Sequence, residues 1–140
     1  MIDLMGLLNS PQRDDVLLRE AGVDLDRALF PLLVRLGLHG PLSVAALADQ
    51  AGRDHTTISR QLAKLESLGL ISRQADDGDR RIRTASLTAE GTRIVEAITA
   101  ARRRLLSKAL AGWSQTDRAS LAGISRRFVD ALAGAAQDRP

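Results

Sequence analysis

The 140-residue chain contains no cysteine. It therefore has no disulfide framework, no thiolate zinc site and no cysteine-based redox switch. Its two histidines, His39 and His55, lie on different predicted elements and lack the paired spacing of metal ligands, so we expect no metal and no cofactor. The absence of cysteine fits a reducing compartment, and we predict a cytoplasmic protein.

Long apolar runs are also missing from the chain. No stretch approaches twenty apolar residues, and the N-terminus lacks the basic start and small-residue cleavage site of a secretory signal. We therefore predict no membrane partner. Charges nearly cancel, because 20 Lys and Arg oppose 17 Asp and Glu. The net charge of +3 excludes a polycationic tail, so binding to a polyanion must depend on where the cations lie.

The chain instead contains a series of amphipathic segments around one hairpin. We predict helices over residues 12–21, 24–38, 44–51, 55–68 and 89–112, and a last helix after Ser114. Ser43 and Asp54 are suited to N-cap two of these helices, and Gly52 is suited to end the first of the two. Pro31 falls inside the helix predicted over 24–38, where we expect a local distortion. Two short helices joined by a tight turn form a helix-turn-helix unit.

The helix that follows Asp54 separates an apolar stripe from a polar face. Ile58, Leu62 and Leu65 recur at spacings of four and three, which predicts that they face the core. The other side carries side chains that can read base edges and hold phosphates, namely Thr56, Thr57, Arg60, Gln61 and Lys64. This pattern predicts a helix that enters the major groove of double-stranded DNA.

A basic hairpin, which we call the wing, is predicted over residues 72–87. Gly69 is suited to the left-handed position after the preceding helix, and residues 76–79 (DDGD) are a turn signal. The candidate DNA-binding residues of the wing are Arg73, Asp79, Arg80, Arg81 and Arg83. Arginine at the tip of a slender hairpin suits the minor groove. We expect Asp79 to hold a wing arginine by a salt bridge.

These two segments resemble MarR-family transcriptional regulators, which are dimeric winged helix-turn-helix proteins. The family's wing motif is matched at every fixed position by Asp79, Arg81, Leu87, Thr88 and Gly91. The preceding TTISRQLAKLESLGLISR also resembles the family's recognition helix, including its ending at Leu65, Glu66, Gly69 and Leu70. The resemblance implies a mainly α fold with a small β-wing, and a homodimeric repressor on a pseudo-palindromic operator. It also implies a small-molecule effector that changes the separation of the two recognition helices, without naming that molecule.

The helix predicted over 89–112 is too long for a domain of this size to cover. Ser114-x-x-Asp117 resembles a capping box and starts a last helix that is also apolar on one side. The candidate dimerisation residues are Leu105, Leu106, Leu110, Leu121, Phe128 and Leu132. We expect a single domain, 1–140, in which 24–88 form the DNA-binding lobe and 1–23 and 89–140 form dimerisation helices. The cations at 102–104 and 108 fit either a solvated helix flank or a second phosphate contact.

Other classes of protein fit the sequence less well. Asp54, His55 and Ser59 diverge around one helix and cannot form a hydrolase triad, so we predict no enzyme. Asp76, Asp77 and Asp79 lack the spacing of a calcium-binding EF-hand. The alternative is a winged-helix module that binds protein without binding DNA, which would carry apolar anchors on the exposed face of its second helix. A small-molecule carrier that had lost DNA binding would show a damaged recognition helix or wing, and both segments are intact.

Overall fold

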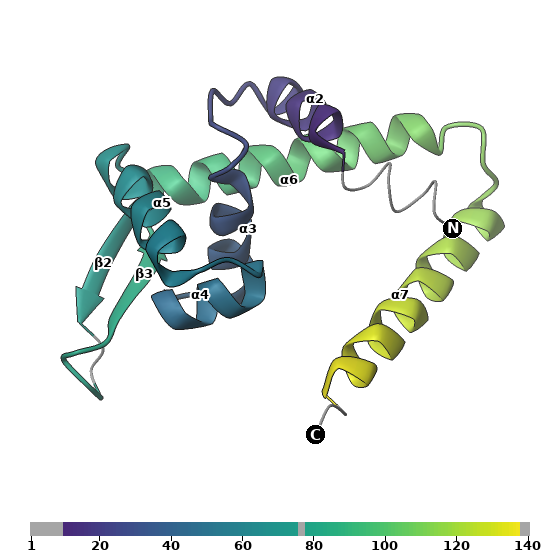
Figure 1. Ribbon diagram of the computed structural model, residues 1–140. Coiled ribbons are helices and arrows are strands. Elements are labelled where there is room, and N and C mark those ends of the chain that lie inside the picture. Colours follow the sequence, from purple (N-terminus) through teal and green to yellow (C-terminus); the bar gives the residue numbers. More distant parts are fainter. Residues whose placement is uncertain (1–9, 76–77, 138–140) are drawn as a thin grey trace. The chain divides into compact units, whose positions relative to one another are not determined.

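The computed structural model describes residues 10–75 and 78–137 (Figure 1). The chain divides into two compact units, one ending at Arg103 and the other beginning at Arg104. Residues 1–9, at the start of the segment 1–23 predicted for dimerisation, and Asp76 and Asp77 of the predicted turn, lie outside the described residues. Within the described ranges, no helix is both long and apolar enough to cross a bilayer.

The chain forms six described helices and one small sheet. In order, the elements are α2 (Pro11–Ala21), α3 (Phe30–His39), β1 (Leu42–Ser43), α4 (Val44–Ala51), α5 (His55–Ser67), β2 (Ile71–Ala75), β3 (Arg83–Leu87), α6 (Ala89–Ala109) and α7 (Gln115–Gln137). The three strands are antiparallel and lie in the order β1-β3-β2. The predicted winged helix-turn-helix fold, mainly α with a small β-wing, is confirmed.

The core of the first unit is aliphatic. Ile58, Leu62 and Leu65 of α5 are completely buried, so the stripe predicted from their spacing is confirmed. They share the core with fully buried side chains of α3, α4 and α6, namely Leu32, Leu33, Leu47 and Ile98. Each such side chain contributes about 1.5–3 kcal/mol through its removal from water. This packing holds α5 by one face and leaves its other face free.

The ends of α4 and α5 follow from local chemistry. The Ser43 hydroxyl accepts a hydrogen bond from the Ala46 N–H at 3.1 Å, and the Asp54 carboxylate accepts one from the Thr57 N–H at 2.7 Å. Both bonds satisfy N–H groups that have no partner inside the helix. Gly52, with φ of 63°, ends α4 in the left-handed conformation that glycine adopts without a steric penalty. The predicted caps are therefore confirmed.

The start of α3 corrects one prediction. The helix begins at Phe30 and not at Asp24, and Pro31 lies in its first turn. Proline has no N–H to donate, so the first turn, where N–H groups lack helical partners, accepts it without distortion. Upstream, the Asp26 carboxylate accepts a hydrogen bond from the Ala28 N–H at 2.9 Å, and this turn leads into the helix.

A two-residue strand, β1, joins the sheet and was not expected. Leu42 and Ser43 pair with Ala85 and Thr84 of β3. This pairing ties the start of α4 to the middle of β3. The strand β2 pairs with β3 along five residue pairs, from Ile71 opposite Leu87 to Ala75 opposite Arg83. Figure 1 shows the β2–β3 hairpin extending beyond the helices of its unit.

The start of α6 is fastened to the end of the α5 segment. The Thr88 hydroxyl donates to the Gly69 carbonyl at 2.6 Å and accepts from the Gly91 N–H at 3.1 Å. Thr88 N–H also donates to the Leu70 carbonyl at 3.1 Å. Gly91 is buried, and a Cβ at this position would overlap the Leu70 carbonyl oxygen. Only glycine allows α6 to approach the chain this closely.

The second unit holds the end of α6 and all of α7. The helix α6 ends at Ala109, three residues before the predicted end, and further backbone bonds continue to Trp113. The Ser114 hydroxyl accepts a hydrogen bond from the Asp117 N–H at 3.1 Å, which confirms the cap predicted for the last helix. No side chain of α7 between residues 115 and 135 is buried.

Candidate nucleic-acid interface

The face of α5 opposite its buried stripe is polar and accessible. Thr56, Arg60 and Lys64 are exposed, and the neighbouring Thr57 and Gln61 are half-buried. Spacings of four residues place the three exposed side chains along one side of the helix, where they can reach a ligand together. The structure therefore brings together the five residues that the sequence predicted for this helix.

The carboxylate at the start of α5 is held in its charged form. Hydrogen bonds from the hydroxyl and then from the backbone N–H of Thr57 lower the pKa of Asp54 below its usual 3.8, and the nearby Arg60 and His55 act in the same direction. At neutral pH Asp54 is therefore an acceptor that caps the helix.

Arg53, which the sequence analysis did not select, is a central contact of the helix-turn-helix. One nitrogen, Nη1, donates to the Ala28 carbonyl at 3.1 Å and to Gln61 Oε1 at 2.8 Å. Arg53 thus links the segment before α3, the turn between α4 and α5, and the polar face of α5. From the sequence, Arg53 is only a basic residue in a turn. Its contact with Ala28 could not be predicted, because the two residues meet only in the packed fold.

Three wing arginines converge on one groove of about 370 Å³. Arg73, Arg81 and Arg83 line it from the hairpin, and His55 lines it from the start of α5. Ser43, Val44, Ala45 and Ile82 complete its wall. Arg80 is exposed but does not line this groove. Concentrated guanidinium groups beside a helix start form a surface that attracts phosphate.

Asp79 organises the backbone of the wing. Its carboxylate accepts a hydrogen bond from the Arg81 N–H at 3.0 Å, and its carbonyl accepts one from the Ile82 N–H at 3.0 Å. The contact differs from the salt bridge that we predicted, because the carboxylate binds the main chain of the arginine and leaves its guanidinium unpaired among the described residues. A short aspartate side chain favours such a local turn.

Comparisons with known proteins agree with this geometry. The MarR family model matches residues 25–82. The HTH-type transcriptional regulator YxaD of Bacillus subtilis is 31% identical over 109 residues, which cover 78% of this chain and 76% of YxaD. The chain belongs to the MarR family. The HTH-type transcriptional repressor MdtR of Bacillus subtilis is 27% identical over 100 residues, which cover 71% of this chain and 64% of MdtR.

Solved structures of the MarR family share the fold. A MarR family protein from Bacillus stearothermophilus superposes with a TM-score of 0.81 at 23% identity, and the match covers 94% of each chain. The chain is therefore a MarR-family transcriptional regulator, and its relatives are regulators, not enzymes. No group of three or more potential metal ligands occurs among the residues that the structure describes.

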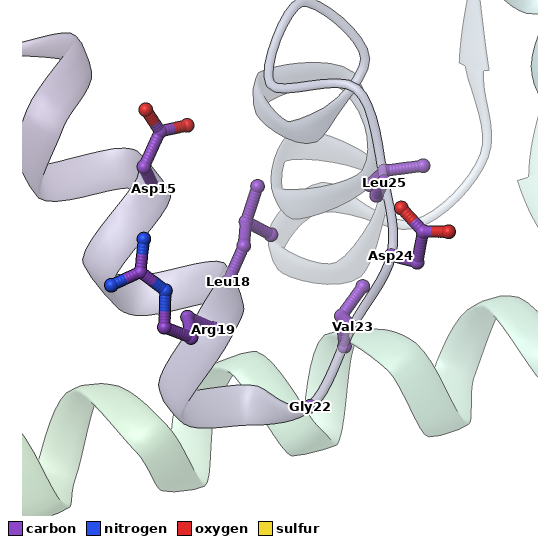
Figure 2. Close-up of a pocket in the computed structure, with 7 residues that line it drawn as sticks. All are labelled: Asp15, Leu18, Arg19, Gly22, Val23, Asp24 and Leu25. Carbon is purple, nitrogen blue, oxygen red and sulfur yellow. The ribbon is translucent and has the colours of Figure 1, made fainter.

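This MarR-family regulator has a second hollow beside α2. Figure 2 shows Leu18 on the helix and Val23 and Leu25 on the following loop around a cavity of about 480 Å³. Charged side chains of both signs, Asp15, Arg19 and Asp24, surround these apolar groups. Asp15 is engaged by an ion pair with Arg27 at 3.2 Å.

The residues predicted for dimerisation leave much apolar surface uncovered in the single chain. Leu106, Leu121, Phe128 and Leu132 are 56%, 39%, 46% and 54% exposed, and Leu105 and Leu110 are half-buried. Trp113, Ile124 and Val129 are also exposed, although the sequence analysis did not select them for this role. Such a concentration of apolar side chains is typical of an interface.

Proposed function

We propose that this MarR-family regulator is a homodimeric, sequence-specific repressor that places α5 in the major groove and the wing in the flanking minor groove. The observation that carries the proposal is the division of α5 into a completely buried stripe and an exposed face of Thr56, Arg60 and Lys64. A helix held by one face presents the other to DNA. The relative MdtR is named a repressor, which supports repression and not activation as the role of this protein.

The groove between the wing and the starts of α4 and α5 supports the same arrangement. Its three arginines lie next to His55, and the hydrogen bond from Arg81 to Asp79 orders the backbone that carries them. Guanidinium groups suit the narrow minor groove, where the negative potential is concentrated. Major-groove and minor-groove contacts made from one lobe would fix its register on the duplex.

The exposed apolar surface supports a homodimer. Side chains such as Leu106 and Phe128 are half exposed, and a second copy of the chain would remove them from water. A two-fold dimer matches a pseudo-palindromic operator with half-sites about one helical turn, ~34–36 Å, apart. A small-molecule effector would act by binding better to one separation of the two lobes than to the other.

The alternative, a module that binds protein, is disfavoured by the same face of α5. Large exposed apolar side chains do not occur within α5, all of which is described, and the nearest is Leu68 at its end. Protein interfaces are dominated by buried aromatic and aliphatic anchors. The polar and cationic face instead offers donors for bases and phosphates.

Selection of bound duplexes from a random DNA pool tests the proposal most directly. We expect the selected sequences to share two inverted half-sites with centres about one helical turn apart. A pool that remains random after selection, at low ionic strength and with a dimeric protein, would overturn sequence-specific binding.

Substitutions on α5 then divide base contacts from phosphate contacts. Arg60→Ala should weaken operator binding far more than binding to unrelated DNA, because a bidentate base contact carries ~1–3 kcal/mol of discrimination. Lys64→Ala should weaken both and lower the slope of log affinity against log salt by roughly one for each phosphate that the lysine neutralises. An equal weakening on operator and random DNA for Arg60→Ala would show that Arg60 contacts phosphate only.

A further inference from the structure

The side chain of Gln61 is oriented by a contact that does not involve DNA. Arg53 Nη1 carries two hydrogens, and one of them is directed to the Ala28 carbonyl at 3.1 Å. The other reaches Gln61 Oε1 at 2.8 Å. Because a main-chain carbonyl positions the guanidinium first, the hydrogen bond to Gln61 is pre-organised and does not rely on two freely moving side chains.

This contact determines which end of the amide faces outward. A guanidinium has donors and no acceptor, so it can bind only the oxygen of Gln61 and not its nitrogen. Nε2 makes no hydrogen bond to the described residues, and it is not among their fully buried, unpartnered polar atoms. The nitrogen is therefore accessible on the polar face of α5, as a donor.

An unconstrained glutamine reads DNA differently. Its oxygen and nitrogen together bind N6 and N7 of adenine, which needs both arms of the amide on one base edge. Oε1 has a second lone pair, but its hydrogen bond to Arg53 directs this arm of the amide at the guanidinium, so that Nε2 is the arm free to meet a base. A lone donor favours bases that offer acceptors in the major groove: guanine offers O6 and N7, thymine O4 and adenine N7 alone, whereas cytosine offers only an amino donor.

We propose that Arg53 is a positioning residue that sets the base preference of Gln61, so that Gln61 selects guanine or thymine over cytosine and does not make the two-armed contact to adenine. The inference rests on the proposed placement of α5 in the major groove. Arg53 itself needs no contact with DNA, because it affects binding only by orienting the side-chain amide of Gln61.

The test compares base preference at every operator position for matched variants. Arg53→Met removes the guanidinium donors and keeps an unbranched, uncharged side chain, so the freed amide should shift preference toward adenine at one position in each half-site, by roughly tenfold. Gln61→Glu should keep the contact with Arg53 but present an acceptor, and preference should move to bases with an amino donor, cytosine and adenine. Arg53→Lys, which retains a donor, should preserve more of the wild-type preference than Arg53→Met.

The double variant Arg53→Met with Gln61→Ala separates positioning from a general structural role. If Arg53 acts through Gln61, the gain for adenine disappears in the double variant. If Arg53→Met instead weakens binding to all duplexes equally and leaves every base preference unchanged, the inference is wrong. Should Arg53→Met fail to fold, unchanged preferences in Gln61→Glu would overturn the inference equally well.

The proposed function fails by a different result. In that case the wild-type protein selects no sequence from the random pool, and none of these variants has a preference to change. If the wild type selects an operator and Arg60→Ala alters it, while the Arg53 and Gln61 variants do not, only the role of Arg53 is rejected.

Discussion

The helix-turn-helix with its wing and the C-terminal helix α7 differ in how much of their apolar surface is buried within a single chain. In the first region Ile58, Leu62 and Leu65 are fully buried, and hydrogen bonds from Arg53 and Thr88 join successive elements. In the second, residues 115–135 include no buried side chain. A helix of this length gains little stability from its backbone alone and depends on packing. The proposed DNA-binding surface is therefore complete within one chain, whereas we propose that α7 needs a second.

The largest expected effect comes from placing a charge on the apolar side of α7. Phe128→Asp should separate the proposed dimer, because an unpaired carboxylate is strongly unfavourable in an apolar interface. Without the link between half-sites, operator affinity should fall by ~100-fold or more. Analytical ultracentrifugation and operator titration measure the two effects.

Ala119→Asp is the matched control, since residue 119 lies half a turn around α7 from residue 128 and is also exposed. We expect this variant to remain dimeric. Dissociation of both variants to the same degree would show that the added charge, and not the apolar surface, decides assembly.

A glycine-to-alanine substitution should have opposite effects on stability in the two regions. Gly91→Ala should destabilise the protein by about 1–3 kcal/mol or more, because the new Cβ overlaps the Leu70 carbonyl oxygen. Gly123→Ala has no atom within 4 Å of its added Cβ among the described residues and lies inside α7. It should stabilise the helix by up to about 1 kcal/mol. Thermal unfolding of both variants measures the two changes in stability. Equal destabilisation would mean that the surface of α7 around Gly123 is closely covered in the folded protein.

The wing should affect DNA affinity without affecting assembly. Arg81→Ala should lower operator affinity by roughly tenfold for each of the two wings of the dimer, the effect of one charge-assisted contact per wing, and leave the dimer and its unfolding temperature unchanged. Arg80→Ala is the adjacent control that does not line the groove, and its effect should be smaller. Hydroxyl-radical footprints that show the same minor-groove protection for wild type and Arg81→Ala would contradict the minor-groove assignment.

The smallest effect concerns the cap of α5 and its dependence on pH. Because its pKa is lowered in the folded protein, Asp54 contributes stability that is present above 3.8 and is lost as pH falls through the lowered value. Asn caps helices but does not titrate in this range. The wild type should therefore be more stable than Asp54→Asn near neutral pH, and the difference should shrink in acid. Unfolding temperatures measured from pH 7 to pH 3 test this, and a constant difference would exclude the carboxylate as the cause.

Sequence alone identified those features that depend on neighbours along the chain. Ser43, Asp54 and Ser114 cap helices because a side-chain oxygen meets an N–H three residues later, a distance set by local geometry. The buried stripe of α5 was predictable for the same reason, from the period of 3.6 residues. The start of α3 was wrongly placed at Asp24, although Pro31 marks a first turn within the sequence itself.

The tertiary structure decided what depends on residues far apart in the chain. Arg53 donates to the Ala28 carbonyl 25 positions away, and Thr88 donates to the Gly69 carbonyl 19 positions away. Neither separation corresponds to the repeat of a helix or a strand, so the sequence does not predict these contacts. The short strand β1 exists only because β3 lies beside it. Folding brings such groups together through the packing of a shared core, so the orientation of Gln61 by Arg53 could be recognised only once that core was in place.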